Sequence, residues 1–170
     1  MSIPVITFAA YSGTGKTTYL EKLLPCLKRR GLRVAVVKHD GHEFQMDTPG
    51  TDTYRLARSG ADTVAILSSG KFALLERRSL QLEDALRHIR DVDLILTEGF
   101  KHGPYPKIAL FRSGSGKPLA VEPQECLAVV SDVPLNVSCP LFPLDDPQPL
   151  ADYLVNTLTE KGDLPHVDHR

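Results

Sequence analysis

A glycine-rich turn near the N-terminus constrains the fold of this chain more than any other feature. It runs from Ala10 to Thr17 with the sequence Ala-Tyr-Ser-Gly-Thr-Gly-Lys-Thr. The apolar residues 5–10 before it predict a buried strand, and a stripe of leucines after it predicts a helix over residues 17–30. Residues 33–38 form a second apolar run. The start of the chain therefore predicts strand, loop, helix and strand, a βαβ unit with parallel pairing.

Further strand and helix patterns follow along the 170 residues. We expect strands at residues 63–67, 71–75, 93–97, 107–111 and 127–130, and helices at residues 52–59, 79–89 and 146–161. Strands that alternate with helices predict a three-layer α/β fold of the P-loop NTPase class, with a mostly parallel sheet and helices on both faces. The length fits a single domain over residues 1–161, and the polar tail at residues 162–170 is expected to fray.

The glycine-rich turn matches the phosphate-binding pattern G-x-x-x-x-G-K-[ST], except that Ala10 replaces the first glycine. Its glycines let backbone N–H groups point at phosphate oxygens, and the positive end of the following helix faces the same anion. We expect Lys16 to stabilise the β- and γ-phosphates in catalysis, the Thr17 hydroxyl to bind Mg²⁺, and Thr18 to contact the α-phosphate. The predicted nucleotide contacts are Ser12, Gly13, Thr14, Gly15, Lys16, Thr17 and Thr18. A turn that only joins strand and helix is the plainer alternative, and the flanking patterns favour phosphate binding.

A second acidic group for the metal is expected after the strand predicted at residues 93–97. Open α/β sheets bind ligands at the carboxyl ends of their strands, where Glu98 lies, whereas Asp93 lies at the opposite end. Glu98 is therefore our candidate for holding Mg²⁺ and assisting catalysis, against the alternative of a solvated strand-end carboxylate. Lys38 and His39 end their strand at the same edge of the sheet and are predicted to face the phosphates.

The connection at residues 39–50 has no periodicity and is longer than most, as functional loops often are. Its two histidines lack a specific zinc spacing and have no cysteine nearby, so a zinc site is the less favoured interpretation. For His42 and Asp47, loop-ordering hydrogen bonds and ligand contacts are equally open. Asp52 and Arg55 share a face of the predicted helix, where a surface ion pair and a role at the site are also equally open.

The sequence contains no clear motif for base specificity. Guanine-specific GTPases commonly carry an Asn-Lys-x-Asp element after a strand, and this chain has none. Asp132 follows the strand predicted at residues 127–130 and is the candidate acceptor for guanine N1 and N2. A turn-capping role for Asp132 is at least equally open.

Composition narrows the class of partner and compartment. A net charge of −1 gives no reason to expect a nucleic-acid or membrane partner. Cys26, Cys126 and Cys139 show no CxxC spacing, which favours a reducing compartment over a disulfide framework. No apolar stretch approaches the ~20 residues that cross a membrane, and the first apolar run lacks the basic start and cleavage site of a signal peptide. We therefore expect a cytoplasmic protein.

Several segments in a fixed order resemble one family. They are residues 8–18, 37–39, 47–54, 59–61, 94–102 and 106–108, and together they resemble MobB, the accessory protein of molybdopterin-guanine dinucleotide biosynthesis. The Lys38-His39 strand end and the Glu-Gly-Phe-Lys segment at residues 98–101 are the more specific parts. The resemblance places the nucleotide at residues 12–18 and the metal near Glu98.

The resemblance also implies what the protein does. It implies binding of GTP and Mg²⁺, weak GTPase activity and a homodimer. The implied partner is the molybdenum cofactor guanylyltransferase of the MobA type, with molybdopterin itself as a further candidate ligand. The alternative function is a P-loop small-molecule kinase that transfers phosphate from ATP or GTP. Such kinases bring an arginine-rich lid over the phosphates, and the candidate arginines here are scattered: Arg55, Arg58, Arg77 and Arg78.

Overall fold

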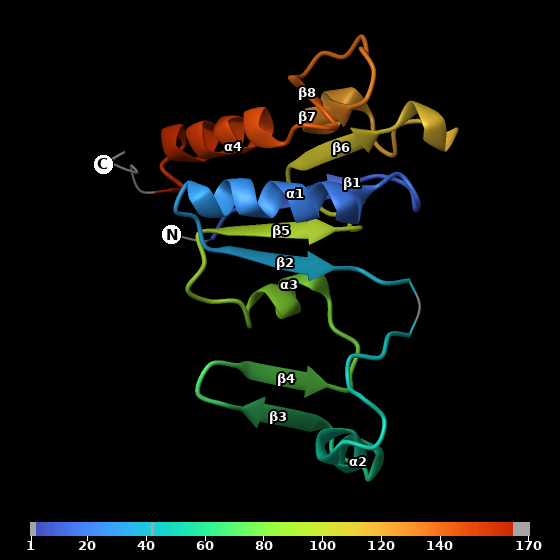
Figure 1. Ribbon diagram of the computed structural model, residues 1–170, viewed down its shortest axis with the longest axis vertical. Coiled ribbons are helices and arrows are strands. Elements are labelled where there is room, and N and C mark those ends of the chain that lie inside the picture. The colour runs from blue at the N-terminus through green and yellow to red at the C-terminus, as the bar shows by residue number, and fades with distance from the viewer. Residues whose placement is uncertain (1–2, 42, 165–170) are drawn as a thin grey trace. The chain divides into compact units, whose positions relative to one another are not determined.

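The structure, a computed structural model, describes residues 3–41 and 43–164 (Figure 1). Its contacts divide the chain into two compact units, which are treated separately below. Unit 1 comprises Met1–His39 and Arg90–Arg170, and unit 2 comprises Asp40–Ile89. The single domain expected over residues 1–161 stays a prediction.

Unit 1 is built on a parallel sheet. Within the described residues its strands are β1 (Val5–Ala9), β2 (Val34–Lys38), β5 (Leu94–Glu98), β6 (Lys107–Phe111), β7 (Cys126–Ser131) and β8 (Leu141–Pro143). They lie in the order β2-β5-β1-β6-β7-β8, and every neighbouring pair is parallel. This sheet and its flanking helices confirm the predicted class of fold.

The predicted pairing of the first two strands is wrong. β1 and β2 are parallel, but β5 lies between them and pairs with both. The reason is burial: all five residues of β5 are buried, whereas β2 keeps Val36 43% exposed. The more apolar strand therefore takes the central place and β2 takes the edge. β8 was not expected at all, because Pro140 and Pro143 bracket it and proline is typical of turns and sheet edges.

Two helices of unit 1 cover one face of the sheet. They are α1 (Lys16–Arg29) and α4 (Gln148–Glu160), and both join the main hydrophobic cluster. Alternate strand residues such as Phe8 and Leu96 meet them there, as the two-residue period of a strand requires. Pro25 lies inside α1 on its exposed side, so water can satisfy the carbonyl that the proline leaves without a donor.

The ends of α4 differ slightly from expectation. Pro147 caps the helix instead of starting it, and the Asp146 carboxylate accepts a hydrogen bond from the Gln148 N–H at 3.0 Å. After the helix, Leu164 is only 4% exposed and belongs to the core cluster. The chain therefore stays packed through Leu164, beyond the point where the sequence suggested fraying. Residues 165–170 of the expected tail lie outside the described residues.

Unit 2 contains α2 (Asp52–Arg58), β3 (Thr63–Leu67), β4 (Phe72–Glu76) and α3 (Leu82–Leu86). β3 and β4 pair with each other as an antiparallel hairpin and form a sheet of their own. The helix predicted at residues 79–89 is shorter, because Gln81 caps it and the chain after it continues in tight turns, with His88 N–H bonded to the Ala85 carbonyl. The Thr51 hydroxyl caps α2 by accepting from the Tyr54 N–H.

A pair of buried hydroxyls lies in the middle of the large sheet and yields a test. Thr7 of β1 and Thr97 of β5 are neighbours in register, are fully buried, and share a hydrogen bond of 2.8 Å. Thr7→Val should lower the free energy of unfolding by about 1–3 kcal/mol, because it leaves the Thr97 hydroxyl buried without its partner. The double variant Thr7→Val/Thr97→Val should recover much of that loss. Urea unfolding of the three variants measures it, and strictly additive losses would contradict the pairing.

Candidate functional site

The glycine loop, residues 10–17, connects β1 to α1 in a backbone conformation that glycine favours. Gly13 and Gly15 have φ of 79° and 100°, in the left-handed region that other residues rarely adopt. Gly15 caps α1, so the helix begins at Lys16 with the free N–H groups of its first turn at the loop. A loop of this shape, followed by a helix N-terminus, is suited to hold an anion.

Lys16 folds back over the loop. Its ammonium group donates to the carbonyl oxygens of Ala10 at 2.9 Å and Tyr11 at 3.1 Å. Burial is the main cause that lowers the pKa of Lys16, and the negative charge of Glu98 opposes this shift. Three further ammonium groups lower the pKa as well; they belong to Lys38, Lys117 and Lys101. The loop thus carries a local excess of positive charge that an anion would neutralise.

Glu98 lies directly beside the start of α1. It ends β5, is only 8% exposed, and accepts the Thr17 hydroxyl at 3.0 and 3.2 Å through its two oxygens. A hydroxyl and a carboxylate are oxygen donors of the kind that Mg²⁺ binds. Among the described residues no group of three or more His, Cys, Asp or Glu side chains could hold a metal ion. A metal held by Thr17 and Glu98 would therefore take its other ligands from phosphate and water, as Mg²⁺ commonly does.

The end of β2 is packed tightly against the end of β5. Lys38 is the register partner of Glu98, and the His39 N–H donates to the Glu98 carbonyl at 2.8 Å. A Cβ atom on Gly99 would lie 3.0 Å from the His39 Cβ, and Gly99 has φ of 111°. The His39 ring meets Phe100 edge-on at 5.0 Å between centroids. Lys38 and His39 thus share the sheet edge with Glu98, as the sequence predicts.

Asp93, the acidic residue not chosen for the metal, lies at the other end of β5. Its carboxylate pairs with the Arg33 guanidinium at 2.9 Å and accepts the Arg33 backbone N–H at 2.7 Å. The side-chain hydrogen bond from Arg33 is the main cause that lowers the pKa of Asp93. Asp93 therefore joins the starts of two strands and takes no part in the site.

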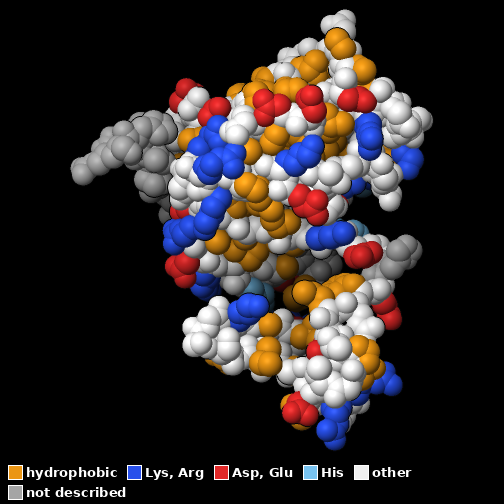
Figure 2. Space-filling view, viewed as in Figure 1, with side chains coloured by type: hydrophobic (Ala, Val, Ile, Leu, Met, Phe, Trp, Pro, Cys, Tyr) orange, Lys and Arg blue, Asp and Glu red, His pale blue; other side chains and the backbone are white. Residues whose placement is uncertain are grey.

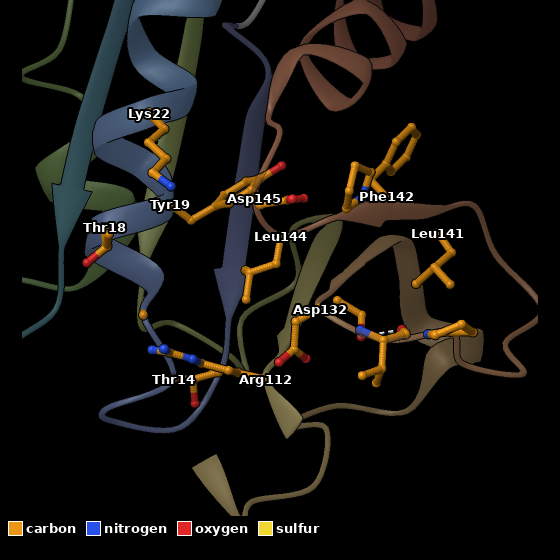
Figure 3. A pocket seen from close by; sticks show the side chains of 15 residues that line it. Thr14, Thr18, Tyr19, Lys22, Arg112, Asp132, Leu141, Phe142, Leu144 and Asp145 are labelled. Atoms are coloured by element: carbon orange, nitrogen blue, oxygen red, sulfur yellow. Dashed lines mark hydrogen bonds between the residues drawn. The ribbon is translucent and has the colours of Figure 1, made fainter. Parts of the chain in front are cut away.

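A cavity of about 650 Å³ opens beside the glycine loop (Figure 3). Thr14 and Thr18 line it from the loop and the first turn of α1, and Leu141 of β8 lines it from the opposite side. In this view Asp132 lies between Thr14 and Leu141. The position is suitable for the nucleoside of a nucleotide whose phosphates occupy the glycine loop, and the volume falls in the range of small-molecule sites.

Asp132 makes the hydrogen bonds expected of a turn-capping residue, one of the two roles predicted for it. Its carboxylate accepts the Ser113 N–H and the Ser113 hydroxyl, each at 2.8 Å. The backbone bond from Ser113 is the main cause that lowers the pKa of Asp132, so the carboxylate stays ionised. Contact with guanine stays a prediction.

Two cationic residues near the loop were missed. The Lys117 ammonium donates to the Ser12 carbonyl at 2.6 Å, and the Lys101 ammonium lies 4.8 Å from the centre of the Tyr11 ring. Residues 112–118 form a largely exposed loop, within which Ser113–Ser115 make a 3₁₀ turn, η1, and Lys117 contacts the glycine loop. The available signal was topological: these residues follow a strand at the carboxyl edge of the sheet.

Unit 2 holds the other acidic candidates. The Asp47 carboxylate accepts the Thr48 N–H at 2.8 Å and the Thr51 hydroxyl at 3.0 Å, and so orders the start of α2. Asp52 and Arg55 form an exposed ion pair at 3.6 Å, a contact that contributes little to stability. His42 lies outside the described residues.

Comparison with known proteins agrees with this architecture. A model of the MobB family, described as molybdopterin guanine dinucleotide synthesis protein B, matches residues 5–132. The molybdopterin-guanine dinucleotide biosynthesis adapter protein of Escherichia coli (strain K12) is 40% identical over 169 residues, covering 94% of this chain and 96% of that protein. The adapter protein of Haemophilus influenzae (strain ATCC 51907 / DSM 11121 / KW20 / Rd) is 37% identical and covers 92% of this chain and 90% of its own length.

The fold comparison gives the same result. The crystal structure of Bacillus subtilis MobB superposes with a TM-score of 0.71 at 28% identity, covering 97% of this chain and 100% of that one. The parallel sheet, the glycine loop and the Thr17–Glu98 pair define a P-loop NTPase-like α/β protein. Within that class, the chain belongs to the MobB family. The helices among residues 3–41 and 43–164 are all too short or too polar to cross a membrane.

Proposed function

We propose that this protein is a GTP-binding adapter of molybdopterin guanine dinucleotide biosynthesis, with weak Mg²⁺-dependent GTPase activity, acting in the cytoplasm. The biosynthetic role follows from membership of the MobB family and from relatives that carry the adapter name. One observation carries the nucleotide part: the glycine loop gathers positive charge around Lys16, beside the Thr17–Glu98 pair.

In this proposal each residue of the loop has a defined task. The backbone N–H groups at Gly13 and Gly15 and the N-terminus of α1 bind phosphate oxygens. Lys16 exchanges two neutral carbonyl acceptors for charged oxygens of the β- and γ-phosphates, which are stronger acceptors. Thr18 contacts the α-phosphate, and Lys38 and His39 add to the polar wall at the sheet edge. Thr17 and Glu98 would hold Mg²⁺, which supplies charge neutralisation at the phosphates.

The hydrolysis is expected to be slow. Glu98 is the acidic group that acts on Lys16, and it already accepts a hydrogen bond from Thr17. The residues near the loop thus stabilise the charge of the phosphates, but none of those described is a strong general base for the attacking water. The base is expected in the cavity beside Thr14, where an ionised Asp132 has lone pairs left to accept guanine N1 and N2.

The kinase alternative receives less support from the arginines that would form a lid. Arg77 donates to the Ala57 carbonyl at 2.6 Å, and Arg78 pairs with Glu76 at 2.6 Å. Arg55 pairs with Asp52. These side chains already make local contacts within unit 2. Rapid GDP or ADP formation that depends on an added acceptor would favour the kinase and contradict the adapter.

Removing the Lys16 ammonium should strongly weaken triphosphate binding. Two hydrogen bonds to charged oxygens, at about 1.5 kcal/mol each, predict about a hundredfold weaker affinity for Lys16→Ala. Calorimetric titration with GTP and Mg²⁺ measures it, and Lys28→Ala in the last turn of the same helix is the matched control. Unchanged affinity in Lys16→Ala would refute the loop assignment.

In a competition titration GTP should displace ATP, and equal affinities would refute the guanine assignment.

The partner should be the molybdenum cofactor guanylyltransferase of the MobA type. Wild-type protein, used as bait in an extract of a molybdate-using bacterium, should enrich this enzyme with GTP present, as mass spectrometry would show. Lys16→Ala should lose the dependence on GTP. An extract in which the guanylyltransferase is never enriched would contradict the adapter role. Pterin fluorescence of the same eluate tests whether molybdopterin binds the protein as well.

A homodimer is the expected assembly, and the hairpin of unit 2 offers a surface for it. Ala65, Leu67, Phe72 and Leu74 share one hairpin face, with Leu67 73% and Phe72 63% exposed. Figure 2 shows hydrophobic side chains at the surface in the region where Figure 1 draws β3 and β4. An exposed apolar hairpin is marginally stable by itself and is suited to pack against a second copy.

Charging this face should therefore give a monomer. Leu67→Glu/Phe72→Glu places two carboxylates on the apolar face and should shift the molecular mass in sedimentation equilibrium from dimer to monomer. Lys71→Glu changes the charge of the same hairpin without removing apolar surface, and it should leave the dimer intact. A double variant that still sediments as a dimer would exclude this face as the interface.

A further inference from the structure

The loop after β6, residues 112–118, reaches the glycine loop from a neighbouring strand. We call it the finger loop. β6 pairs with β1 in parallel, so the loops that follow these two strands leave the same edge of the sheet side by side. The Lys117 ammonium spans the gap and donates to the Ser12 carbonyl at 2.6 Å. A cation from elsewhere in the chain thus lies on the glycine loop.

The finger loop is held in place by hydrogen bonds at both ends of its turn. Asp132, which follows β7, accepts the Ser113 N–H and hydroxyl, so the next strand anchors the loop. The Ser115 hydroxyl donates to the Arg112 carbonyl at 2.7 Å and accepts the Lys117 N–H at 3.2 Å. Gly116, with φ of 65°, completes the turn before Lys117. These contacts fix the backbone from which the Lys117 side chain extends.

Two ammonium groups therefore cover adjacent carbonyls of the glycine loop. Lys16 bonds to those of Ala10 and Tyr11, and Lys117 bonds to that of Ser12. The charge of Lys117 acts on Lys16 and lowers the pKa of Lys16. Two like charges that lie near each other repel, and neutral carbonyl oxygens offset this repulsion only weakly. An anion bound between the two ammonium groups would stabilise both charges more strongly than the carbonyls do. In the proposed function Lys16 contacts the terminal phosphates, and Lys117, on the next carbonyl of the same loop, would lie beside them.

We propose that Lys117 is a cationic finger, supplied by this chain itself, for the terminal phosphate of the bound triphosphate. The proposal rests on the nucleotide-binding function proposed above. During hydrolysis the water oxygen forms a bond to the γ-phosphorus while the bond to the β,γ-bridging oxygen breaks. The bridging oxygen leaves on GDP with the electron pair, and both water protons end on the released phosphate. Lys117 transfers no proton; its charge stabilises the negative charge that shifts to the phosphate oxygens in the transition state. Asp132, through Ser113, positions the finger.

A point charge at the terminal phosphate has two measurable consequences. It favours a triphosphate over a diphosphate, because GDP lacks the group that Lys117 contacts. It also speeds hydrolysis, as arginine fingers do in related enzymes. A lysine that only stiffened the empty glycine loop would change the affinities for GTP and GDP together and would leave their ratio unchanged.

The test compares Lys117→Ala and Lys117→Arg with wild-type protein. Calorimetry with Mg²⁺ measures the affinities for GDP and for a non-hydrolysable GTP analogue, and single-turnover assays with excess protein measure GTP hydrolysis. Lys117→Ala should bind the analogue about tenfold more weakly, as expected for the loss of one charged hydrogen bond, and bind GDP within about twofold of wild type. Its hydrolysis should fall at least about tenfold, and Lys117→Arg should restore most of both losses. Lys161→Ala, an exposed charge change at the end of α4, is the matched control.

The outcomes separate the two proposals. An unchanged ratio of analogue to GDP affinity, or an unchanged hydrolysis rate in Lys117→Ala, would overturn the finger while wild-type binding still supports the nucleotide site. Failure of wild-type protein to bind either nucleotide would overturn the proposed function, and the finger with it.

Discussion

The parallel pairing of β1 with β5 determines where the site can form. Their register places Glu98 beside Phe8, two residues before the glycine loop begins. Neighbouring residues of paired strands point to the same face, so Glu98 faces the side on which α1 starts, and its carboxylate meets the Thr17 hydroxyl. β2 on the other side of β5 brings Lys38 to the same height. A shift of one residue in the pairing of β1 with β5 would turn the carboxylate away from the helix.

Electrostatics then distinguishes this sheet edge from an ordinary strand–helix junction. Among the described residues, Glu98 is the carboxylate that offsets the lysine charges acting on Lys16, which come from three separate segments of unit 1. Each of these charges raises the free energy of the others, and the free N–H groups at the start of α1 add to the positive potential. Clustered positive charges do not stabilise a turn that only joins a strand to a helix, whereas they do stabilise a bound polyphosphate. The charge distribution, more than the motif alone, argues for the nucleotide.

The apolar patterns and the glycine motif predicted individual strands and the residues at their ends. The strands at residues 63–67 and 107–111 coincide with β3 and β6, and the glycine loop and Glu98 lie at the strand ends where their apolar neighbours indicated. The order of the strands was not predictable in this way, because whether β5 or β2 lies beside β1 depends on burial summed over the whole sheet. The contact between Lys117 and Ser12 joins residues 105 positions apart, and no pattern within either segment encodes it. Long-range pairing therefore explains what the sequence alone left open.

Asp132 shows how the two ends of a bound nucleotide would depend on one side chain. An ionised carboxylate has about four lone-pair positions, and Ser113 uses two of them. The remaining positions can accept the two guanine donors proposed for the cavity without releasing the finger loop. Base recognition and the position of Lys117 would then rest on the same charge, so substitution of Asp132 would alter both at once. Lys117 acts at the phosphate end alone, and its substitution separates the two effects.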